Sequence, residues 1–247
     1  MRVSIIIPTQ RRPAGLATAV GSVLAQAGVD PAGLELIIAD NDAVPSAKAL
    51  AASLAKDAPF PVVYLHEPAP GVASVRNAAV AKARGGWIAF LDDDQEAPAG
   101  WLAALLAAQE RLGTDVVFGP VKARAPEAPA AHRPYLEWFF SREGPAQEGV
   151  LDGYYGCGDS LMRRSLLGER PFSMERNFIG GEDDLLFGTL QRAGTRFGWS
   201  PQAFVYEDPL PERQTLSYAL ARAFAYGQGP SEHCAAQSPP DHLGLAR

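Results

Sequence analysis

The sequence predicts an α/β fold with a mixed, mainly parallel central sheet flanked by helices. Short apolar runs rich in β-branched or aromatic residues alternate with longer helical stretches through the first 119 residues, which is the pattern of strands joined by crossover helices. Polar or turn-forming residues follow each run at once, as expected for buried parallel strands that end at a sheet edge. No apolar run reaches the length of about 18 residues that a membrane-spanning helix needs.

The individual elements follow from these runs and from the breaks between them. Gly85 and Gly86 end the third helix, because glycine readily adopts the backbone conformation found after a helix. The expected strands are Val3–Ile7, Leu34–Ala39, Val62–Leu65, Trp87–Leu91, Asp115–Gly119 and Arg196–Trp199. The expected helices are Ala14–Ala27, Ser46–Asp57, Gly71–Arg84, Trp101–Leu112, Leu185–Arg192 and Thr215–Tyr226.

The segment 122–152 lacks this regularity. It contains four prolines and the aromatic side chains of Tyr135, Trp138, Phe139 and Phe140. A long irregular segment inside a compact domain is typical of a functional loop or a lid. The alternative is a surface excursion whose aromatic side chains pack on the core.

Composition and charge limit the classes of partner. The chain has 247 residues, enough for one large domain, and a net charge of −6 from 28 Asp and Glu against 22 Lys and Arg. This acidic balance argues against nucleic acid as a partner, since nucleic-acid-binding proteins display basic surfaces. The two cysteines, Cys157 and Cys234, exclude a disulfide scaffold. The first residues lead directly into a strand without the pattern of a signal peptide, so we expect a cytoplasmic protein.

Polar residues follow three of the expected strands, as Thr9, Asp40–Asp42 and Asp92–Asp94. Because ligands bind beyond the carboxyl ends of parallel strands, we expect these clusters to form one site. Asp92 and Asp94 are two residues apart, so their carboxylates can share a face and offer oxygen ligands to Mg²⁺ or Mn²⁺ on a diphosphate. The alternative is an acidic turn in solvent.

A second acidic cluster, Glu182–Asp184, follows two glycines at the start of an expected helix. A carboxylate near a metal-bound diphosphate can act as general base for an incoming hydroxyl. Helix stabilisation alone is the alternative, because acidic residues are favoured in a first helical turn.

Arg76 is either an exposed arginine or a cation beside a nucleotide. The absence of G-x-S-x-G, G-x-x-x-x-G-K-[ST] and G-x-G-x-x-G motifs removes the usual support for serine hydrolases, P-loop enzymes and dinucleotide-binding folds.

Taken together and in order, these clusters resemble the family 2 glycosyltransferases of the GT-A fold, from Val3 to about Gly229. Ser4–Pro13 is similar to that family's opening strand and nucleotide loop, and Ile37–Asp42 is similar to its second strand with the base-binding aspartate. Gly71–Ala78 resembles the stretch before the family's D-x-D segment, and Phe90–Asp94 resembles that segment itself. Gly181–Leu185 is similar to the family's acidic motif at the acceptor site.

The resemblance implies one glycosyltransferase domain over residues 1–229. Residues 1–119 would form its nucleotide-sugar-binding half and residues 120–229 its acceptor-binding half. The remaining residues, 230–247, are expected to form a poorly ordered tail.

The resemblance further implies a nucleoside-diphosphate sugar as donor, expected to be linked to UDP, with Mn²⁺ or Mg²⁺ as cofactor. Thr9 and Asp40 would hold the base, and Arg76 would lie near the nucleotide. Asp92 would face the ribose or the metal, and Asp94 would ligate the cation. The full implied nucleotide-sugar-binding set is Pro8, Thr9, Arg12, Asp40, Arg76, Asp92 and Asp93.

On the acceptor side, the resemblance implies that Asp183 is the general base and that Glu182 orients the acceptor or the base. Gly158, Asp159 and Trp138 are expected to line the acceptor.

One position departs from the family pattern. Many relatives carry a histidine near Val205 that completes metal binding, whereas this chain has Glu207. Glu207 is expected to replace it as an oxygen ligand. The alternatives are that this loop plays no metal role, or that Arg213 neutralises the leaving diphosphate.

The expected activity is therefore an inverting, metal-dependent transfer of a sugar to a hydroxyl of a saccharide or lipid-linked saccharide, in polysaccharide or glycolipid assembly. The resemblance leaves contact with the inner face of the membrane open. One alternative is a nucleotide-sugar-binding domain without turnover. Another is a sugar-nucleotide nucleotidyltransferase, although the loop after Pro8 lacks that class's glycines. A third is a phosphatase or phosphotransferase with an aspartate nucleophile, although Glu96 stands where Thr or Val is usual.

Overall fold

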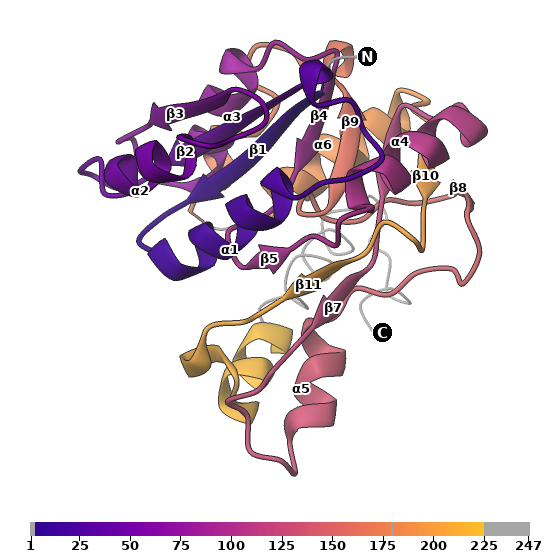
Figure 1. Ribbon diagram of the computed structural model, residues 1–247. Helices are drawn as coiled ribbons and strands as arrows, with labels where there is room; N and C mark the ends of the chain where they lie inside the picture. The colour runs from indigo at the N-terminus through magenta and orange to yellow at the C-terminus, as the bar shows by residue number, and fades with distance from the viewer. Residues whose placement is uncertain (1–2, 179, 225–247) are drawn as a thin grey trace. The chain divides into compact units, whose positions relative to one another are not determined.

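The computed structural model of the protein describes residues 3–178 and 180–224 (Figure 1). The chain falls into two compact units. The first comprises the described residues of Met1–Lys122 and Arg142–Glu207, and the second those of Ala123–Ser141 and Asp208–Arg247. Both units therefore draw on the expected acceptor half, residues 120–229. The expected tail, residues 230–247, lies outside the described residues.

The first unit is built on an eight-stranded mixed sheet of strand order β3-β2-β1-β4-β9-β6-β10-β8 (Figure 1). Strand β1 is parallel to β2 and β4, β2 to β3, and β6 to β10. Strand β9 is antiparallel to β4 and β6, and β8 is antiparallel to β10. The predicted α/β class is confirmed. The strands are β1 (Val3–Thr9), β2 (Leu34–Asp40), β3 (Val62–His66), β4 (Trp87–Phe90), β6 (Val116–Phe118), β8 (Gly149–Leu151), β9 (Ser160–Arg163) and β10 (Phe197–Trp199).

Helices cover both faces of this sheet, and the alternation of side chains along β1 shows how. Ile5 and Ile7 pack in one cluster with buried residues of α1, α2 and α4. Ile6 packs in the other with residues of α3 and α6. A strand buried on both faces reads as a continuous apolar run, which explains why the sequence signal was clear. The helices are α1 (Pro13–Leu24), α2 (Lys48–Leu54), α3 (Val72–Lys82), α4 (Trp101–Leu112) and α6 (Glu182–Arg192).

All six expected strands and all six expected helices occur, with displaced ends; the expected helix Thr215–Tyr226 corresponds to helical residues 216–224. Strands β1 and β2 run on to Thr9 and Asp40, because their ladder continues through these two residues. Helix α3 begins only at Val72, because Gly71 adopts a φ of 111° that does not belong to a helix.

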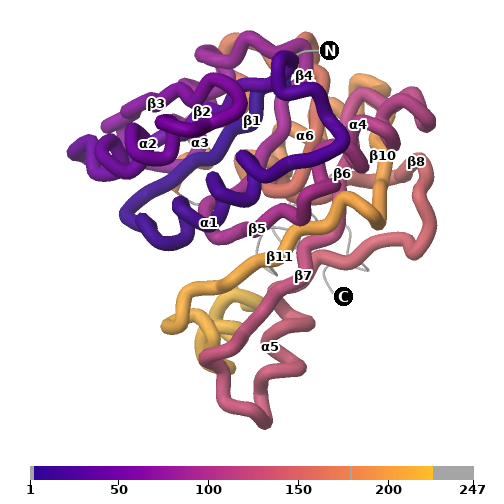
Figure 2. The backbone as a smooth tube through the Cα atoms, viewed as in Figure 1, coloured from indigo at the N-terminus to yellow at the C-terminus, as the bar shows by residue number. Residues whose placement is uncertain are grey.

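The expectation of an irregular segment at 122–152 is only partly correct. Figure 2 lets the reader follow the backbone through β7 (Val121–Ala123), α5 (Arg133–Phe140) and β8. Helix α5 was not predicted because the prolines of this segment argue against a helix. Pro134 is nevertheless compatible with α5, because it lies in the first turn, where no backbone N–H is needed. Strand β9 was also missed, since four residues between two partner strands carry no periodic pattern of their own.

A smaller sheet also belongs to the first unit. Strand β11 (Val205–Glu207) pairs antiparallel with β5 (Gln95–Glu96), which places Glu207 opposite Gln95. This pairing joins two chain segments that lie about a hundred residues apart, and it brings Glu207 to the strand that follows Asp92–Asp94.

The second unit has its own small core of Ala125, Ala128, Leu136 and Ala219. Arg124 pairs with Asp208 at 2.6 Å within it. Among residues 3–178 and 180–224, none of the helices is long and apolar enough to cross a bilayer.

Candidate active site

The structure brings the loop after β1 together with the acidic segment after β4. The Thr9 hydroxyl donates to Asp93 Oδ2 at 2.7 Å. Arg12 Nη1 donates to Asp93 Oδ1 at 3.1 Å and to Asp94 Oδ2 at 2.6 Å. Burial raises the pKa of Asp93 to about 6, although the bonds from Thr9 and Arg12 favour its charged form. Thr9, Arg12, Asp93 and Asp94, all expected at the donor or metal site, therefore form one hydrogen-bonded group.

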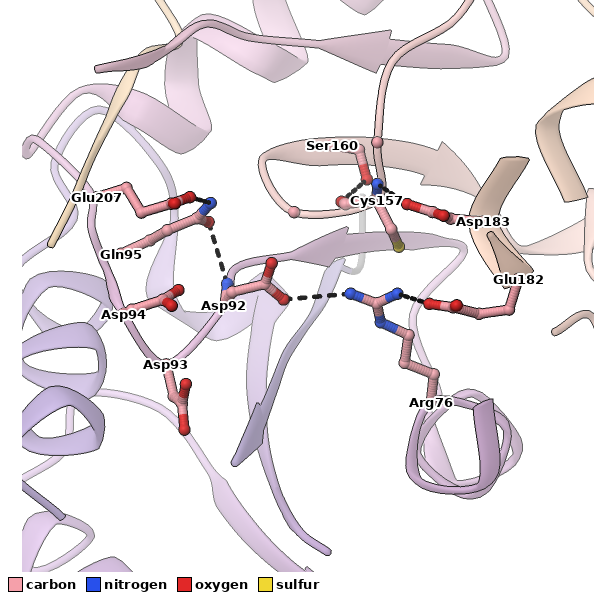
Figure 3. A network of polar contacts seen from close by, with 12 residues as sticks. Arg76, Asp92, Asp93, Asp94, Gln95, Cys157, Ser160, Glu182, Asp183 and Glu207 are labelled. Atoms are coloured by element: carbon pink, nitrogen blue, oxygen red, sulfur yellow. Dashed lines mark hydrogen bonds and ion pairs between the residues drawn. The ribbon is translucent and has the colours of Figure 1, made fainter. Parts of the chain in front are cut away.

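Asp92 faces away from this group, towards α3 and the segment before β9. Arg76 Nη2 lies 3.3 Å from Asp92 Oδ1 (Figure 3). The backbone N–H of Asp92 donates to Gln95 Oε1 at 3.0 Å. Gly158 lies so close that any side chain there would collide with Asp92 Oδ2. Gly158, expected on the acceptor side, therefore borders the D-x-D segment directly.

Asp40 does not offer a free oxygen to a ligand. Its side chain is fully buried. Oδ2 accepts hydrogen bonds from the Ala47 N–H and the Tyr64 hydroxyl, both at 2.8 Å. Oδ1 accepts from the Asp42 N–H at 3.1 Å and the Ser46 hydroxyl at 3.4 Å. With its acceptor positions used inside the chain, Asp40 shapes the loop after β2. Its expected contact with a nucleotide base stays a prediction.

Pro8 is the last of the expected donor residues, and it lies within β1, opposite Ala39 of β2. Its neighbour Arg11 adopts a positive φ of 57°. This conformation directs the Arg11 side chain to Asp42, which it binds through two bonds of 2.9 and 2.7 Å. The turns after β1 and β2 are thus held together by charge.

Asp94 and Glu207 are the expected metal ligands, together with Asp92. Burial, together with the charges of Asp94 and Asp92, raises the pKa of Glu207 to about 8. The pKa of Asp94 is raised by burial and by the charge of Asp92. Gln95 Nε2 holds Glu207 Oε2 at 3.2 Å (Figure 3). Within the described ranges, no group of three or more His, Cys, Asp or Glu side chains is already close enough to hold a metal ion.

The chemistry of these three residues nevertheless fits a divalent cation. Carboxylate oxygens are the ligands that Mg²⁺ and Mn²⁺ prefer. Carboxylates that raise one another's pKa carry excess negative charge, which a cation would balance.

The acidic motif at the start of α6 divides between two environments. Glu182 is buried, and its Oε1 accepts from Arg76 Nη1 at 2.7 Å. Asp183 remains partly exposed, and its Oδ2 accepts from the backbone N–H of Cys157 at 3.0 Å. Figure 3 shows Arg76 between Asp92 and Glu182, with Cys157 beside Asp183. The buried Glu182 can position Arg76, whereas the exposed Asp183 can accept a proton.

Asn177 is a residue of this region that carries no recognisable motif. Its Oδ1 accepts from the N–H groups of Ala73 and Ser74 at 2.9 and 3.2 Å, and its Nδ2 donates to Pro70 O at 2.6 Å. It thereby caps α3 from about a hundred residues away. Gly71 is required beside it, because its φ is positive and a side chain would collide with Asn177. This cap fixes the start of the helix that presents Arg76.

Asp159, which is expected to line the acceptor, is a buried residue. Its side chain has no exposed surface, and its Oδ1 accepts from Trp101 Nε1 at 2.7 Å. Burial raises its pKa to about 7, against the charge of Arg142 and the Trp101 bond. The Asp159 carboxylate therefore bonds within the fold, and its expected place beside the acceptor stays a prediction.

Trp138 and Arg213, two further candidates, belong to the second unit. The Trp138 side chain on α5 is 66% exposed. The Arg213 guanidinium lies over the ring of Tyr218, 5.8 Å from its centre.

The mixed α/β sheet, with carboxylates after β4 and at the start of α6, agrees with the fold that the resemblance to GT-A glycosyltransferases implies. Residues 4–170 match the family profile described as glycosyl transferase family 2. The chain is 37% identical over 233 residues to the succinoglycan biosynthesis protein ExoM of Rhizobium meliloti (strain 1021), covering 92% of this chain and 74% of that protein. This chain belongs to glycosyl transferase family 2 and is a glycosyltransferase.

Solved structures of S. aureus TarS share the fold. The crystal structure of TarS superposes with a TM-score of 0.63 at 17% identity, covering 86% of this chain and 37% of that one. The complex of TarS 1–349 with UDP superposes with a TM-score of 0.60, also at 17% identity, covering 86% of this chain and 62% of that one. The corresponding UDP-GlcNAc complex gives a TM-score of 0.60 at 17% identity, covering 84% of this chain and 58% of that one. The chain thus spans between 37% and 62% of the length of these TarS chains.

Proposed function

We propose that this protein is an inverting glycosyltransferase that moves a sugar from a UDP-sugar to an acceptor hydroxyl during polysaccharide or glycolipid assembly. The observation that carries the proposal is that two sets of contacts connect Asp92 with Asp183. In the first, Arg76 binds both Asp92 and Glu182, the residue next to Asp183. In the second, the segment Gly156–Gly158 lies against Asp92 through Gly158 and binds Asp183 through the Cys157 N–H. A donor-side and an acceptor-side carboxylate held at fixed separation are what a single displacement requires.

Two comparisons support the identity of the substrates. TarS, which shares the fold, has been solved with UDP and with UDP-GlcNAc. ExoM, which is 37% identical, is described as a succinoglycan biosynthesis protein. We accordingly propose a nucleoside-diphosphate sugar donor and a saccharide or lipid-linked saccharide acceptor.

The donor is proposed to lie across the carboxyl ends of β1, β2 and β4. Thr9, Arg12 and Asp93 form the hydrogen-bonded floor there. Arg76 offers positive charge beside Asp92. Pro8 and Asp40 are proposed to act on the donor indirectly, by shaping the turns after β1 and β2.

Mn²⁺ or Mg²⁺ is proposed as cofactor, held by Asp94, Asp92 and Glu207. When bound, the cation supplies positive charge that stabilises the departing diphosphate. The Gln95 side chain connects two of these three residues, since its Oε1 accepts from the backbone N–H of Asp92 and its Nε2 donates to the Glu207 carboxylate.

Asp183 is proposed to take the proton of the acceptor hydroxyl. The acceptor oxygen then forms its bond to the anomeric carbon as the bond from that carbon to the diphosphate oxygen breaks, so the configuration inverts. The Cys157 N–H holds Asp183 in place, while the partial exposure of its side chain leaves room for the hydroxyl.

The test is transfer from a panel of UDP-sugars with Mn²⁺, comparing the wild type with Asp183→Asn. Removing a general base lowers turnover by about 10²- to 10⁴-fold, while UDP binding should be retained. Asp184→Asn is the matched control, because Asp184 is the exposed neighbour on the same helical turn. Near-normal turnover in Asp183→Asn would remove Asp183 as base. Donor binding without turnover in the wild type would instead identify a binding domain.

A cytoplasmic location is proposed, with the inner face of the membrane as the place where a lipid-linked acceptor is met. The exposed aromatic side chains of Tyr135 and Trp138, 41% and 66% exposed on α5, are the features that support contact with lipid. Co-sedimentation with anionic lipid vesicles should weaken in Trp138→Ser. Equal sedimentation of variant and wild type would exclude this contact.

A further inference from the structure

Arg142 is the residue that the proposed chemistry leaves unused although it lies directly behind the site. It follows α5 and returns the chain to the first unit, where its backbone exchanges hydrogen bonds with Val121 at 2.8 and 3.0 Å. Its side chain is only 19% exposed.

The Arg142 guanidinium binds backbone carbonyls of two neighbouring segments. Nη1 donates to Gly156 O at 3.1 Å. Nη2 donates to Gly158 O at 2.6 Å, to Gly119 O at 3.0 Å and to Asp159 O at 3.2 Å. Buried carbonyls need such partners, since an unpaired one costs about 1–3 kcal/mol. Gly156 and Gly158 have no side chains with which to pack, so this guanidinium holds their carbonyls, while Cys157 between them is held by the burial of its side chain and by the Ser160 hydroxyl, which donates to Cys157 O at 2.6 Å.

The segment that Arg142 holds is also the one that touches both reacting sides. Its Cys157 N–H binds Asp183 Oδ2 at 3.0 Å. Its Gly158 lies against Asp92 Oδ2. A shift of this segment would therefore move the acceptor-side carboxylate relative to the donor-side one.

Asp159, the residue after Gly158, lies beside the Arg142 guanidinium. It has a positive φ of 59° and is fixed by the Trp101 bond. Its Oδ2 has no hydrogen-bond partner within the described part of the chain and lies 3.9 Å from Arg142 Nη2. Asp159 therefore lies beside the guanidinium without a hydrogen bond to it, and it attracts Arg142 when it is ionised.

We propose that Arg142 is a positioning residue that sets the distance between Asp183 and Asp92 by holding the carbonyls of Gly156 and Gly158. The proposal rests on the proposed function, in which Asp183 accepts the acceptor proton. Lysine cannot replace arginine in this role, because one ammonium nitrogen cannot reach the carbonyls that two guanidinium nitrogens bind.

The first experiment compares Arg142→Lys with Arg111→Lys, which keeps charge at the exposed Arg111–Glu148 pair. We expect Arg142→Lys to lower kcat by about 10- to 100-fold, the cost of an ångström-scale misplacement, with the dissociation constant of UDP changed less than twofold. Arg111→Lys should leave both unchanged. A parallel loss of UDP affinity and kcat, or a kcat within twofold of wild type, would overturn the proposal.

A second variant disturbs the same geometry without removing Arg142. A Cβ on residue 156 would lie 3.3 Å from Asp183 Oδ2 and 3.4 Å from Arg142 Nη1, whereas one on residue 153 would meet nothing within 4 Å. Gly156→Ala should therefore lower kcat and leave UDP binding unchanged, with Gly153→Ala as the silent control. Comparison of Gly156→Ala with Gly153→Ala tests the proposal even if Arg142→Lys fails to fold. Equal kcat values in the two alanine variants would contradict the proposal.

A third readout is independent of activity. The chain contains two cysteines, so ¹⁵N-cysteine labelling gives two amide signals, and Cys234→Ser assigns that of Cys157. Arg142→Lys should shift the Cys157 amide signal and speed its hydrogen exchange, whereas Arg111→Lys should not. An unchanged signal in Arg142→Lys would show that Arg142 does not hold the segment. A wild type without any sugar transfer would instead refute the proposed function and the catalytic purpose of Arg142 with it, whatever the signal shows.

Discussion

The buried ion pair between Arg76 and Glu182 allows a sharp test of how the site is held together. Both side chains are less than a tenth exposed, and their closest atoms are 2.7 Å apart. Replacing Arg76 by methionine keeps an apolar stem of similar length but leaves Glu182 as an uncompensated buried charge. Breaking a buried pair in this way costs about 3–5 kcal/mol. The second partner of Arg76, Asp92, is about a third exposed. Solvent can therefore stabilise its charge when Arg76 is removed, and the lost contact adds little to the loss of stability.

This loss of stability should be visible as a fall in melting temperature. For a protein of this size, 1 kcal/mol corresponds to about 2–4 °C, so Arg76→Met should lower Tm by about 6–20 °C. The double variant Arg76→Met with Glu182→Gln should recover most of this, because its buried residue at 182 no longer carries charge. Urea titration of the wild type, both single variants and the double variant completes the cycle. Additive losses in the double variant would refute the view that the charge left on Glu182 is the cause.

Three further predictions concern single side chains. Glu207→Ala should weaken Mn²⁺ binding by about tenfold or more, while the exposed Glu110→Ala should not; equal affinities in a Mn²⁺ titration would remove Glu207 from the ligand set. Asn177→Ala should destabilise the fold by about 1–3 kcal/mol in urea titrations, because two N–H groups at the start of α3 lose their acceptor, and a wild-type midpoint would show that this cap is dispensable. The pKa of Asp159 is raised from 3.8 to about 7 in the fold, so the unfolded chain ionises first and stability falls as pH rises from about 4 through 7. Asp159→Asn should lose less stability than the wild type between pH 5 and pH 8, and parallel losses would contradict this assignment.

The predictions made from sequence succeeded where the signal was local. The strand runs were readable because β1, β2 and β4 are buried on both faces by helices. The prediction that Thr9 and Asp92–Asp94 meet followed from the rule that parallel strands end at one edge, and β1 and β4 do pair in parallel. The family resemblance was read from the same local segments, and the family is confirmed.

The surroundings of a side chain could not be predicted where they come from distant parts of the chain. Asp159 is buried, and its partner Trp101 lies 58 residues away. The oxygens of Asp40 accept hydrogen bonds from Tyr64 and from the loop after β2. The helix within 122–152 was missed because four prolines outweighed its apolar pattern.

The sequence by itself therefore determined the alternating strands and helices, the kinds of functional group at the strand ends, and the family. Only the tertiary structure decided which of those groups face one another. It placed Glu207 opposite Gln95 through the pairing of β5 and β11, and it put Arg142 behind Gly156–Gly158. The physical reason is that these contacts join residues with no periodic or local relation along the chain. They form only when packing of the core brings the segments together.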